Sequence, residues 1–337
     1  MVRRKDVGSE LEKLRRTVKM AKRLLAKEEY MITDPEILEK FVLYEKEPEK
    51  KIARIIFNRP EMLNALPIHA FDRVAELVRD AEMDDDVKVI IFKGNGPCFG
   101  TGADADELGY YIGYGKGDTP EERRRPSQRR RMLGDKLHTA GPLSYTQTVM
   151  RCLKATICQV HGYCYGGHVY IAMASDIVIA SEDAMFTHPA FRYLGPLAPF
   201  SEWILTIGLK RVKEMVLTMR PIEADEAERW GMVNRVVPLE RLEQEVNDWA
   251  QAISIMPIDS LCVGKALIEA NLEAMGIGVG YWTEWAGHGW TTNQRFEPGE
   301  WNFMKARRDK GLSAALDERD RMVAPFFRMG KEARKEK

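Results

Sequence analysis

The 337-residue chain has no excess of charge, because 51 lysines and arginines balance 51 aspartates and glutamates. Proteins that bind nucleic acid through bulk electrostatics are strongly basic, so we expect no nucleic-acid partner. The chain also lacks an apolar run near the roughly 20 residues that cross a bilayer. Its first 30 residues are basic and contain no apolar signal core. These absences favour a cytoplasmic protein with no membrane partner.

Cysteine is scarce, and the few cysteines form no recognisable pairs. Their number is odd, no two form a C-x-x-C pair, and none has a cysteine or histidine partner at zinc-site spacing. We therefore expect reduced, buried or half-buried thiols and no metal. The cysteines are Cys98, Cys152, Cys158, Cys164 and Cys262.

Common catalytic and nucleotide-binding signatures are missing as well. The sequence contains no G-x-S-x-G, no H-E-x-x-H and no P-loop. Residues 94–100 ("GNGPCFG") lack the G-x-G-x-x-G spacing of a dinucleotide fingerprint. The commonest hydrolase, kinase and NAD-dependent functions are therefore disfavoured.

What the sequence does contain is an alternation of strand-like and helical segments. Residues 41–58 form two strand-like runs around a charged turn, and residues 67–86 carry apolar side chains at helical spacing. The apolar runs at 87–94 and 156–163 are typical of strands buried on both faces. Such alternation predicts βαβ crossovers and a mostly parallel sheet.

Helical patterns dominate the second half of the chain. Residues 200–219 predict one helix, and after Pro238 the strand signal vanishes. Residues 239–256 and 259–275 predict amphipathic helices, and the rest of the chain shows no clear strand. We therefore expect an α/β protein in three parts. These are a basic helical N-terminal arm at 1–38, a core at 39–240, and a helical C-terminal segment with a basic tail at 241–337.

Two glycine-rich junctions follow two of the predicted strands. They are Phe99–Asp104 ("FGTGAD") and Tyr165–His168 ("YGGH"). Glycine lets the backbone approach a ligand closely, and the first N–H groups of a helix lack intrahelical partners. Either junction alone is better explained as a tight turn. Together, on neighbouring strands, they can direct two N–H groups at one carbonyl oxygen and form an oxyanion hole.

Residues 87–108 ("VKVIIFKGNGPCFGTGADADEL") and 159–186 ("QVHGYCYGGHVYIAMASDIVIASEDAMF") resemble the two signature regions of the crotonase, or enoyl-CoA hydratase/isomerase, superfamily. Residues 58–66 ("NRPEMLNAL") and 223–238 ("EADEAERWGMVNRVVP") resemble further motifs of that family, in the same order. The resemblance spans roughly residues 40–270. It implies a crotonase-like spiral of ββα repeats with a helical C-terminal segment.

The resemblance also implies a function. The substrate would be an acyl-CoA thioester, with coenzyme A as part of the substrate and no other cofactor, and the enzyme would be an enoyl-CoA hydratase/isomerase-like lyase. The protein would form a homotrimer or a dimer of trimers. The N–H groups of Ala103 and Gly167 match the family's oxyanion hole, which stabilises a thioester enolate. The substrate-binding positions expected around them are Asn64, Leu66, Phe99, Thr101, Gly102, Asp104, Gly166 and Ala190.

The chain departs from the family at two catalytic positions. The glutamate that follows the glycine run in the family's hydratases is Tyr170 here, and a second glutamate, after a proline, is Ala190. A carboxylate is the natural base near neutral pH, whereas a tyrosine, with a reference pKa of about 10, serves better as an acid. Ordinary hydration is thus in doubt. C–C bond hydrolysis or decarboxylation of a cyclic or branched acyl-CoA stays open, as does a catalytically silent acyl-CoA binder.

Several other polar residues have two interpretations. His188 either replaces the missing base, for which its reference pKa is suitable, or caps a turn. For His168, packing is favoured over lining the pocket. Asp104 is favoured as a tether of its loop rather than a reacting group, and nothing selects Asp106, although it could reach the acyl pocket.

Two segments outside the motifs also have alternatives. For the arginines at 123–125 and 129–131, a solvated loop is favoured over binding of the coenzyme A phosphates. For the tryptophan-rich stretch at 278–301, a subunit interface is favoured over a cover for the acyl group or a plain core.

Overall fold

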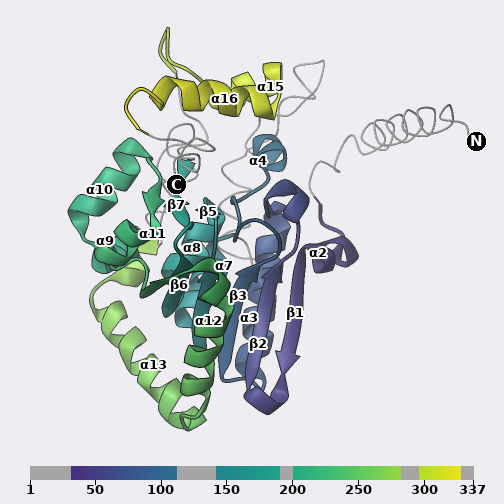
Figure 1. Ribbon diagram of the computed structural model, residues 1–337, viewed down its shortest axis with the longest axis vertical. Helices are drawn as coiled ribbons and strands as arrows, with labels where there is room; N and C mark the ends of the chain where they lie inside the picture. The colour runs from purple at the N-terminus through teal and green to yellow at the C-terminus, as the bar shows by residue number, and fades with distance from the viewer. Residues whose placement is uncertain (1–31, 112–141, 190–199, 282–295, 328–337) are drawn as a thin grey trace, which may run out of the picture.

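The computed structural model describes residues 32–111, 142–189, 200–281 and 296–327 (Figure 1). In this part of the chain, the larger sheet has the strand order β1-β2-β3-β4-β6-β9. β1 pairs antiparallel with β2, and the other neighbours are parallel. The strands are β1 (Val42–Glu47), β2 (Ile52–Phe57), β3 (Val89–Gly94), β4 (Ala155–Val160), β6 (Ile177–Ser181) and β9 (Arg235–Val237).

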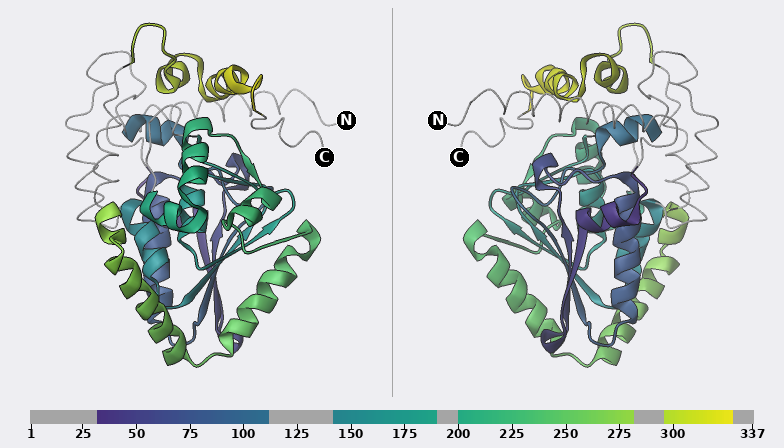
Figure 2. Two further views of the ribbon diagram at one scale, coloured as in Figure 1. Left: turned by 90° about the vertical axis from the view of Figure 1, so that its left-hand side faces the viewer. Right: turned by 90° about the vertical axis from the view of Figure 1, so that its right-hand side faces the viewer.

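Helices cover both faces of the larger sheet. α3 (Ile68–Met83) lies on one face and α12 (Leu239–Ser254) on the other, as Figure 2 shows. β2 and β4 are buried at every position, which explains why both strands are continuous apolar runs. The predicted parallel sheet with helices on its faces is therefore confirmed.

A second, smaller sheet contains β5 (Tyr163–Tyr165), β7 (Met185–Thr187) and β8 (Ile222–Glu223). β4 continues directly into β5 and then into α8 (Gly167–Ala174), and β6 continues directly into β7. A strand of the large sheet, a strand of the small sheet and a helix thus form the repeated unit. This arrangement confirms the predicted fold of ββα repeats.

Local predictions from the sequence are mostly confirmed. The expected hairpin is β1 and β2, joined by the 3-10 turn η1 (Pro48–Lys50), and the expected helix at 67–86 is α3. The single helix expected at 200–219 is wrong, because the chain forms α9 (Phe200–Ile207) and α10 (Leu209–Thr218). Gly208 separates them with φ +84°, a backbone conformation that cannot continue a helix.

The C-terminal segment is helical, as predicted. After β9 the described residues contain α12, α13 (Ile258–Ala274), α15 (Phe303–Lys310) and α16 (Leu312–Val323), and no strand. α15 and α16 lie at one end of the molecule, beyond α4 (Ala105–Tyr111), at the top of Figure 1. The three-part division remains a prediction. The N-terminal arm up to residue 31, both arginine runs and most of the tryptophan-rich stretch lie outside the described residues.

Within the described ranges, no single helix is long and apolar enough to cross a membrane. α12 and α13 reach that length and composition only when they are taken together across a bend of 101°.

The cysteines are buried thiols, as expected. Four are buried, and Cys262 is half-buried. Burial raises the pKa of the Cys152 and Cys158 thiols to about 12, so neither is a ready nucleophile near neutral pH.

Candidate active site

The first glycine-rich junction pairs with β5 before it reaches the predicted site. The Gly100 N–H donates to the Tyr163 carbonyl over 2.8 Å, and the Gly100 carbonyl accepts from the Tyr165 N–H over 2.8 Å. These bonds form a parallel bridge between Gly100 and Cys164. Because both segments then continue in the same direction, Gly102 of the first junction lies beside Gly166 of the second.

The two junctions touch at Gly102 and Gly166. A Cβ atom placed on Gly102 would lie 3.1 Å from the Gly166 Cα and 3.1 Å from the Gly167 nitrogen. Gly102 has φ +94° and Gly166 has φ +57°, so both adopt conformations that favour glycine. The structure therefore brings together the two bends that the sequence predicts as one site.

Backbone pairing with Leu66 sets the direction of the Ala103 N–H. The Leu66 N–H donates to the Gly102 carbonyl over 2.9 Å, and the Leu66 carbonyl accepts from the Asp104 N–H over 2.7 Å. Successive peptide groups alternate in direction in such a bridge, so the Ala103 N–H points away from Leu66. Within the described residues this N–H has no hydrogen-bond acceptor.

Gly167 is the first residue of α8, and Gly166 is its N-cap. The Gly166 N–H donates to the Thr187 carbonyl over 3.1 Å, which attaches the bend to β7. The Gly167 N–H is one of the first N–H groups of the helix and has no acceptor in the described part of the chain. An oxyanion hole needs two N–H donors that are close together and not otherwise bonded, and these two bends provide such a pair.

Asn64 helps to hold the first junction in place. Its side chain is fully buried, and its amide nitrogen donates to the carbonyls of Asn95 (2.9 Å) and Cys98 (2.8 Å). Its amide oxygen accepts from the Arg59 N–H over 2.8 Å. The side chain that was expected to bind substrate is thus engaged in fixing the loop.

Asp104 also has a positional role. One carboxylate oxygen pairs with the Arg59 guanidinium at 2.8 Å, and the other accepts from the Asp106 N–H at 2.9 Å, at the start of α4. These contacts agree with the interpretation of Asp104 as a tether of its loop.

Of the remaining predicted substrate-binding residues, Leu66 and Phe99 are fully buried in the main hydrophobic core. The Thr101 hydroxyl donates to the Leu63 carbonyl over 3.1 Å. Core packing or a backbone hydrogen bond thus engages each of these side chains. Ala190 lies outside the described residues.

Tyr170 and His188 form a buried aromatic stack. Their ring centroids are 4.8 Å apart at an interplanar angle of 21°, and Trp203 lies 5.7 Å from Tyr170. Tyr170 is 5% exposed and His188 is 4% exposed. Burial lowers the pKa of His188 to about 3, which argues against this ring as a general base near neutral pH.

His168 is fully buried, which confirms the packing interpretation. Its Nδ1 also accepts a hydrogen bond from the Gly102 N–H over 3.0 Å. Nothing in the sequence indicates this bond between the two junctions, because its partners are 66 positions apart.

Two acidic residues of α4 have roles that the sequence did not reveal. Glu107 is buried and accepts from the N–H groups of Ile32 and Ile68, which joins α4 to the start of α3. Burial raises the pKa of Glu107 to about 7. Asp106 pairs with the buried Arg307 of α15 at 2.5 Å, so its carboxylate faces the C-terminal segment.

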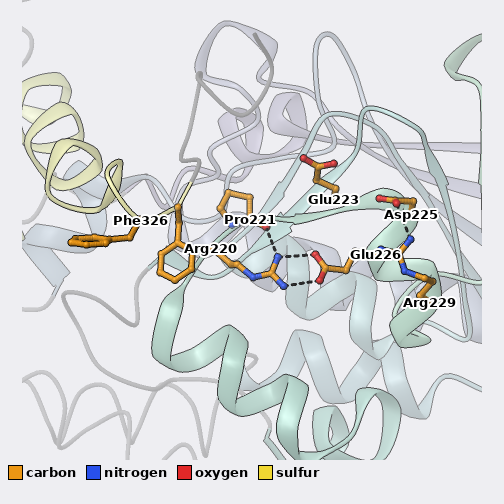
Figure 3. A pocket seen from close by; sticks show the side chains of 8 residues that line it. Arg220, Pro221, Glu223, Asp225, Glu226, Arg229 and Phe326 are labelled. Atoms are coloured by element: carbon orange, nitrogen blue, oxygen red, sulfur yellow. Dashed lines mark hydrogen bonds and ion pairs between the residues drawn. The ribbon is translucent and has the colours of Figure 1, made fainter. Parts of the chain in front are cut away.

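A polar cavity of about 400 Å³ lies elsewhere, where α11 (Ala224–Trp230) meets the end of α16 (Figure 3). Arg220 pairs there with Glu226 and Glu214 at 2.6 Å each and lies 5.5 Å from the Trp230 ring. No predicted site residue lines this cavity. The lining residues are Arg220, Pro221, Glu223, Asp225, Glu226, Arg229, Phe326 and Phe327.

Comparison with known proteins agrees with this architecture. The sequence profile of the family described as Enoyl-CoA hydratase/isomerase matches residues 47–279. A "Probable enoyl-CoA hydratase" of Mycobacterium bovis is 29% identical over 230 residues, which cover 68% of this chain and 81% of the relative. A protein of the same name, described as mitochondrial, from Dictyostelium discoideum is 29% identical over 230 residues, 67% of this chain and 75% of the relative.

Solved structures give the same result. A crystal structure of an enoyl-CoA hydratase from Mycobacterium smegmatis matches with a TM-score of 0.71 and 25% identity, covering 87% of this chain and 97% of that chain. An enoyl-CoA hydratase/isomerase from Xanthobacter autotrophicus Py2 matches with a TM-score of 0.69 and 28% identity, covering 84% and 98%.

Proposed function

The chain belongs to the enoyl-CoA hydratase/isomerase family, and we propose that it binds an acyl-CoA thioester and stabilises the enolate of that thioester. The observation that carries the proposal is the pair of unused N–H groups, Ala103 and Gly167, on two bends in van der Waals contact. The thioester oxygen would accept from both groups. As charge moves onto this oxygen in the transition state, both hydrogen bonds strengthen, and each is worth about 3–4 kcal/mol of barrier.

Main-chain donors suit this chemistry because their positions are fixed before substrate binds. The Gly102 carbonyl is held by Leu66, and the start of α8 is held through Gly166 and β7. Donors that need no reorientation stabilise developing charge more effectively than water does. The proposed hole is therefore independent of the side chains that handle protons.

The residues at the family's two proton-handling positions argue against hydration. Water addition needs a base that removes a proton from water, and the positions of the family's two glutamates hold Tyr170 and Ala190. Tyr170 instead stacks on the neutral ring of His188. We propose that Tyr170 supplies a proton as an acid.

This aromatic stack favours decarboxylation as a second candidate reaction. In the decarboxylation of an acyl-CoA with a carboxylate on its α carbon, the C–C bond to that carboxylate breaks and carbon dioxide leaves. The electron pair forms the enolate, whose oxygen would accept from Ala103 and Gly167. A proton from Tyr170 then reaches the α carbon, and solvent restores the tyrosine. No step needs a general base, unlike C–C hydrolysis, which needs an activated water.

We further propose that the protein assembles with copies of itself, as a trimer or a dimer of trimers. The support comes from α13, which exposes large apolar side chains along much of its length. A patch of this kind marks an interaction surface. The exposed fractions in α13 are Val263 58%, Leu267 62% and Ile268 61%, and Met275, directly after its last residue, is 63% exposed. Sedimentation velocity of the wild type and of Leu267→Glu tests this proposal: a monomeric wild type contradicts it.

A panel of acyl-CoA thioesters, followed by mass spectrometry, tests the main proposal. The panel includes straight-chain enoyl, α-carboxy acyl and cyclic β-oxo acyl thioesters. Hydration and C–C hydrolysis add the mass of water, and decarboxylation removes carbon dioxide. Turnover that Tyr170→Phe abolishes supports the enzyme, whereas binding of every thioester without turnover supports a silent acyl-CoA binder. If no coenzyme A ester raises the melting temperature, the proposal is wrong.

A further inference from the structure

We propose that His168 is a positioning residue, which aligns the Ala103 N–H with the Gly167 N–H by holding the Gly102 peptide in place. This inference rests on the proposed oxyanion hole. His168 directly follows one proposed donor, Gly167, and Gly102 directly precedes the other, Ala103. The hydrogen bond of 3.0 Å from the Gly102 N–H to His168 Nδ1 therefore joins the immediate neighbours of both donors.

The bond holds Gly102, a residue whose backbone dihedral angles no side chain restricts. Gly102 has no side chain and φ +94°, so its peptide groups can rotate more freely than those of other residues. His168 holds its N–H, and Leu66 holds its carbonyl. The Gly102 carbonyl and the Ala103 N–H belong to one planar peptide, so any rotation of Gly102 reorients the donor.

The imidazole itself is held firmly. Its ring lies 4.6 Å from the Phe57 ring at 88° and 5.7 Å from the Phe99 ring at 79°. A Cβ atom on Gly100 would lie 2.2 Å from His168 Nε2, so the ring occupies the space that this glycine leaves open. Packing of this kind restricts the ring to one orientation, with Nδ1 toward Gly102.

The ring also has the protonation state that the bond requires. Nδ1 must be unprotonated to accept from an N–H, which places the proton of the neutral ring on Nε2. Burial lowers the pKa of His168 to about 3, so the ring stays neutral over the working range of pH. Nε2 is buried and has no hydrogen-bond partner among the described residues. Buried polar groups without partners are rare, and packing alone is better served by an apolar side chain.

The test uses a cinnamoyl-CoA with a 4-dimethylamino group, whose absorption band moves to longer wavelength when its carbonyl is polarised. His168→Leu keeps the bulk and removes the acceptor, and His168→Asn restores an acceptor near the place of Nδ1. His161→Leu is the matched control, because it removes an imidazole that bonds the Gly96 carbonyl at 2.9 Å but not Gly102.

We expect a red shift in the wild type and in the control, most of it lost in His168→Leu and at least half regained in His168→Asn. With a turned-over thioester, kcat of His168→Leu should fall about 10- to 100-fold with KM nearly unchanged, as expected for misplaced transition-state donors. A wild type that binds the probe without a shift contradicts the proposed hole itself. A normal wild-type shift that His168→Leu retains overturns only the role of His168.

If His168→Leu does not fold, the double variant His168→Gly/Gly100→Ala replaces it. This variant removes the acceptor and returns a methyl group to part of the vacated space. The folded double variant should also lack the shift, and a full shift in that variant overturns the inference.

Discussion

The contact between Gly102 and Gly166 leads to a prediction that the structure makes quantitative. In Gly102→Ala the new methyl carbon would lie 3.1 Å from three backbone atoms, namely the Gly166 Cα, the Gly167 nitrogen and the Tyr165 carbonyl oxygen. Backbone atoms cannot swing aside as a flexible side chain can, so the two bends must move apart by a few tenths of an ångström. In addition, alanine is strained at φ +94° by about 1–3 kcal/mol.

Gly208 provides a matched control for this experiment. It has φ +84°, close to that of Gly102, but a Cβ atom there would meet nothing within 4 Å. Gly208→Ala should therefore show the conformational strain alone, about 1–3 kcal/mol of unfolding free energy. Gly102→Ala should lose about 1–2 kcal/mol more, because the steric contact adds to the strain. Equilibrium unfolding in urea measures both losses.

Activity separates the two variants further. Displacement of the bends moves the Ala103 and Gly167 N–H groups relative to each other, so kcat of Gly102→Ala should fall about 100-fold. Gly208→Ala should keep its kcat, since Gly208 lies between α9 and α10 and not at the junctions. Equal stability losses in the two variants, together with unchanged turnover in Gly102→Ala, would refute the close contact and its role.

Three further predictions concern stability and thiol chemistry. Arg220→Met should lower the unfolding free energy by about 1–2 kcal/mol, because its two ion pairs with glutamates are lost, and high salt should reduce the difference. The pKa of Glu107 is about 7 in the folded protein, compared with an ordinary value of 4.5, so the folded state keeps this proton to a higher pH than the unfolded state does. Below pH 4.5 the carboxyl is protonated in both states and its ionisation does not affect stability. As the pH rises from 4.5 to 7, ionisation favours the unfolded state and lowers the unfolding free energy by up to about 3 kcal/mol. Glu107→Gln should therefore flatten the fall in unfolding free energy over this range, and an unchanged slope would contradict the raised pKa. In the native protein Cys262 should react first with a thiol reagent, ahead of the four buried cysteines, which unfolding should release.

The sequence predicts the parts of this molecule that depend on local pattern. Apolar runs identify β3 and β4 because both are buried on both faces, and the glycine spacing identifies the two junctions. The interactions that the sequence does not reveal join residues far apart in the chain. His168 and Gly102 are separated by 66 positions, and Arg307 and Asp106 by 201. Neither residue type nor local spacing specifies such a partner, which depends on how the repeats pack.

The same distinction separates the proposed oxyanion hole from the side chains near it. The donors are main-chain groups, and their directions depend on glycines and on bonds to Leu66 and His168. Tyr170 lies one turn along α8 from Gly167 and packs against His188 and Trp203, so its side chain takes no part in those bonds. A substitution of the Tyr170 side chain should therefore leave the backbone geometry of the proposed hole intact. The proposed pair of amide donors and the side chains that would handle protons can therefore be altered independently of each other.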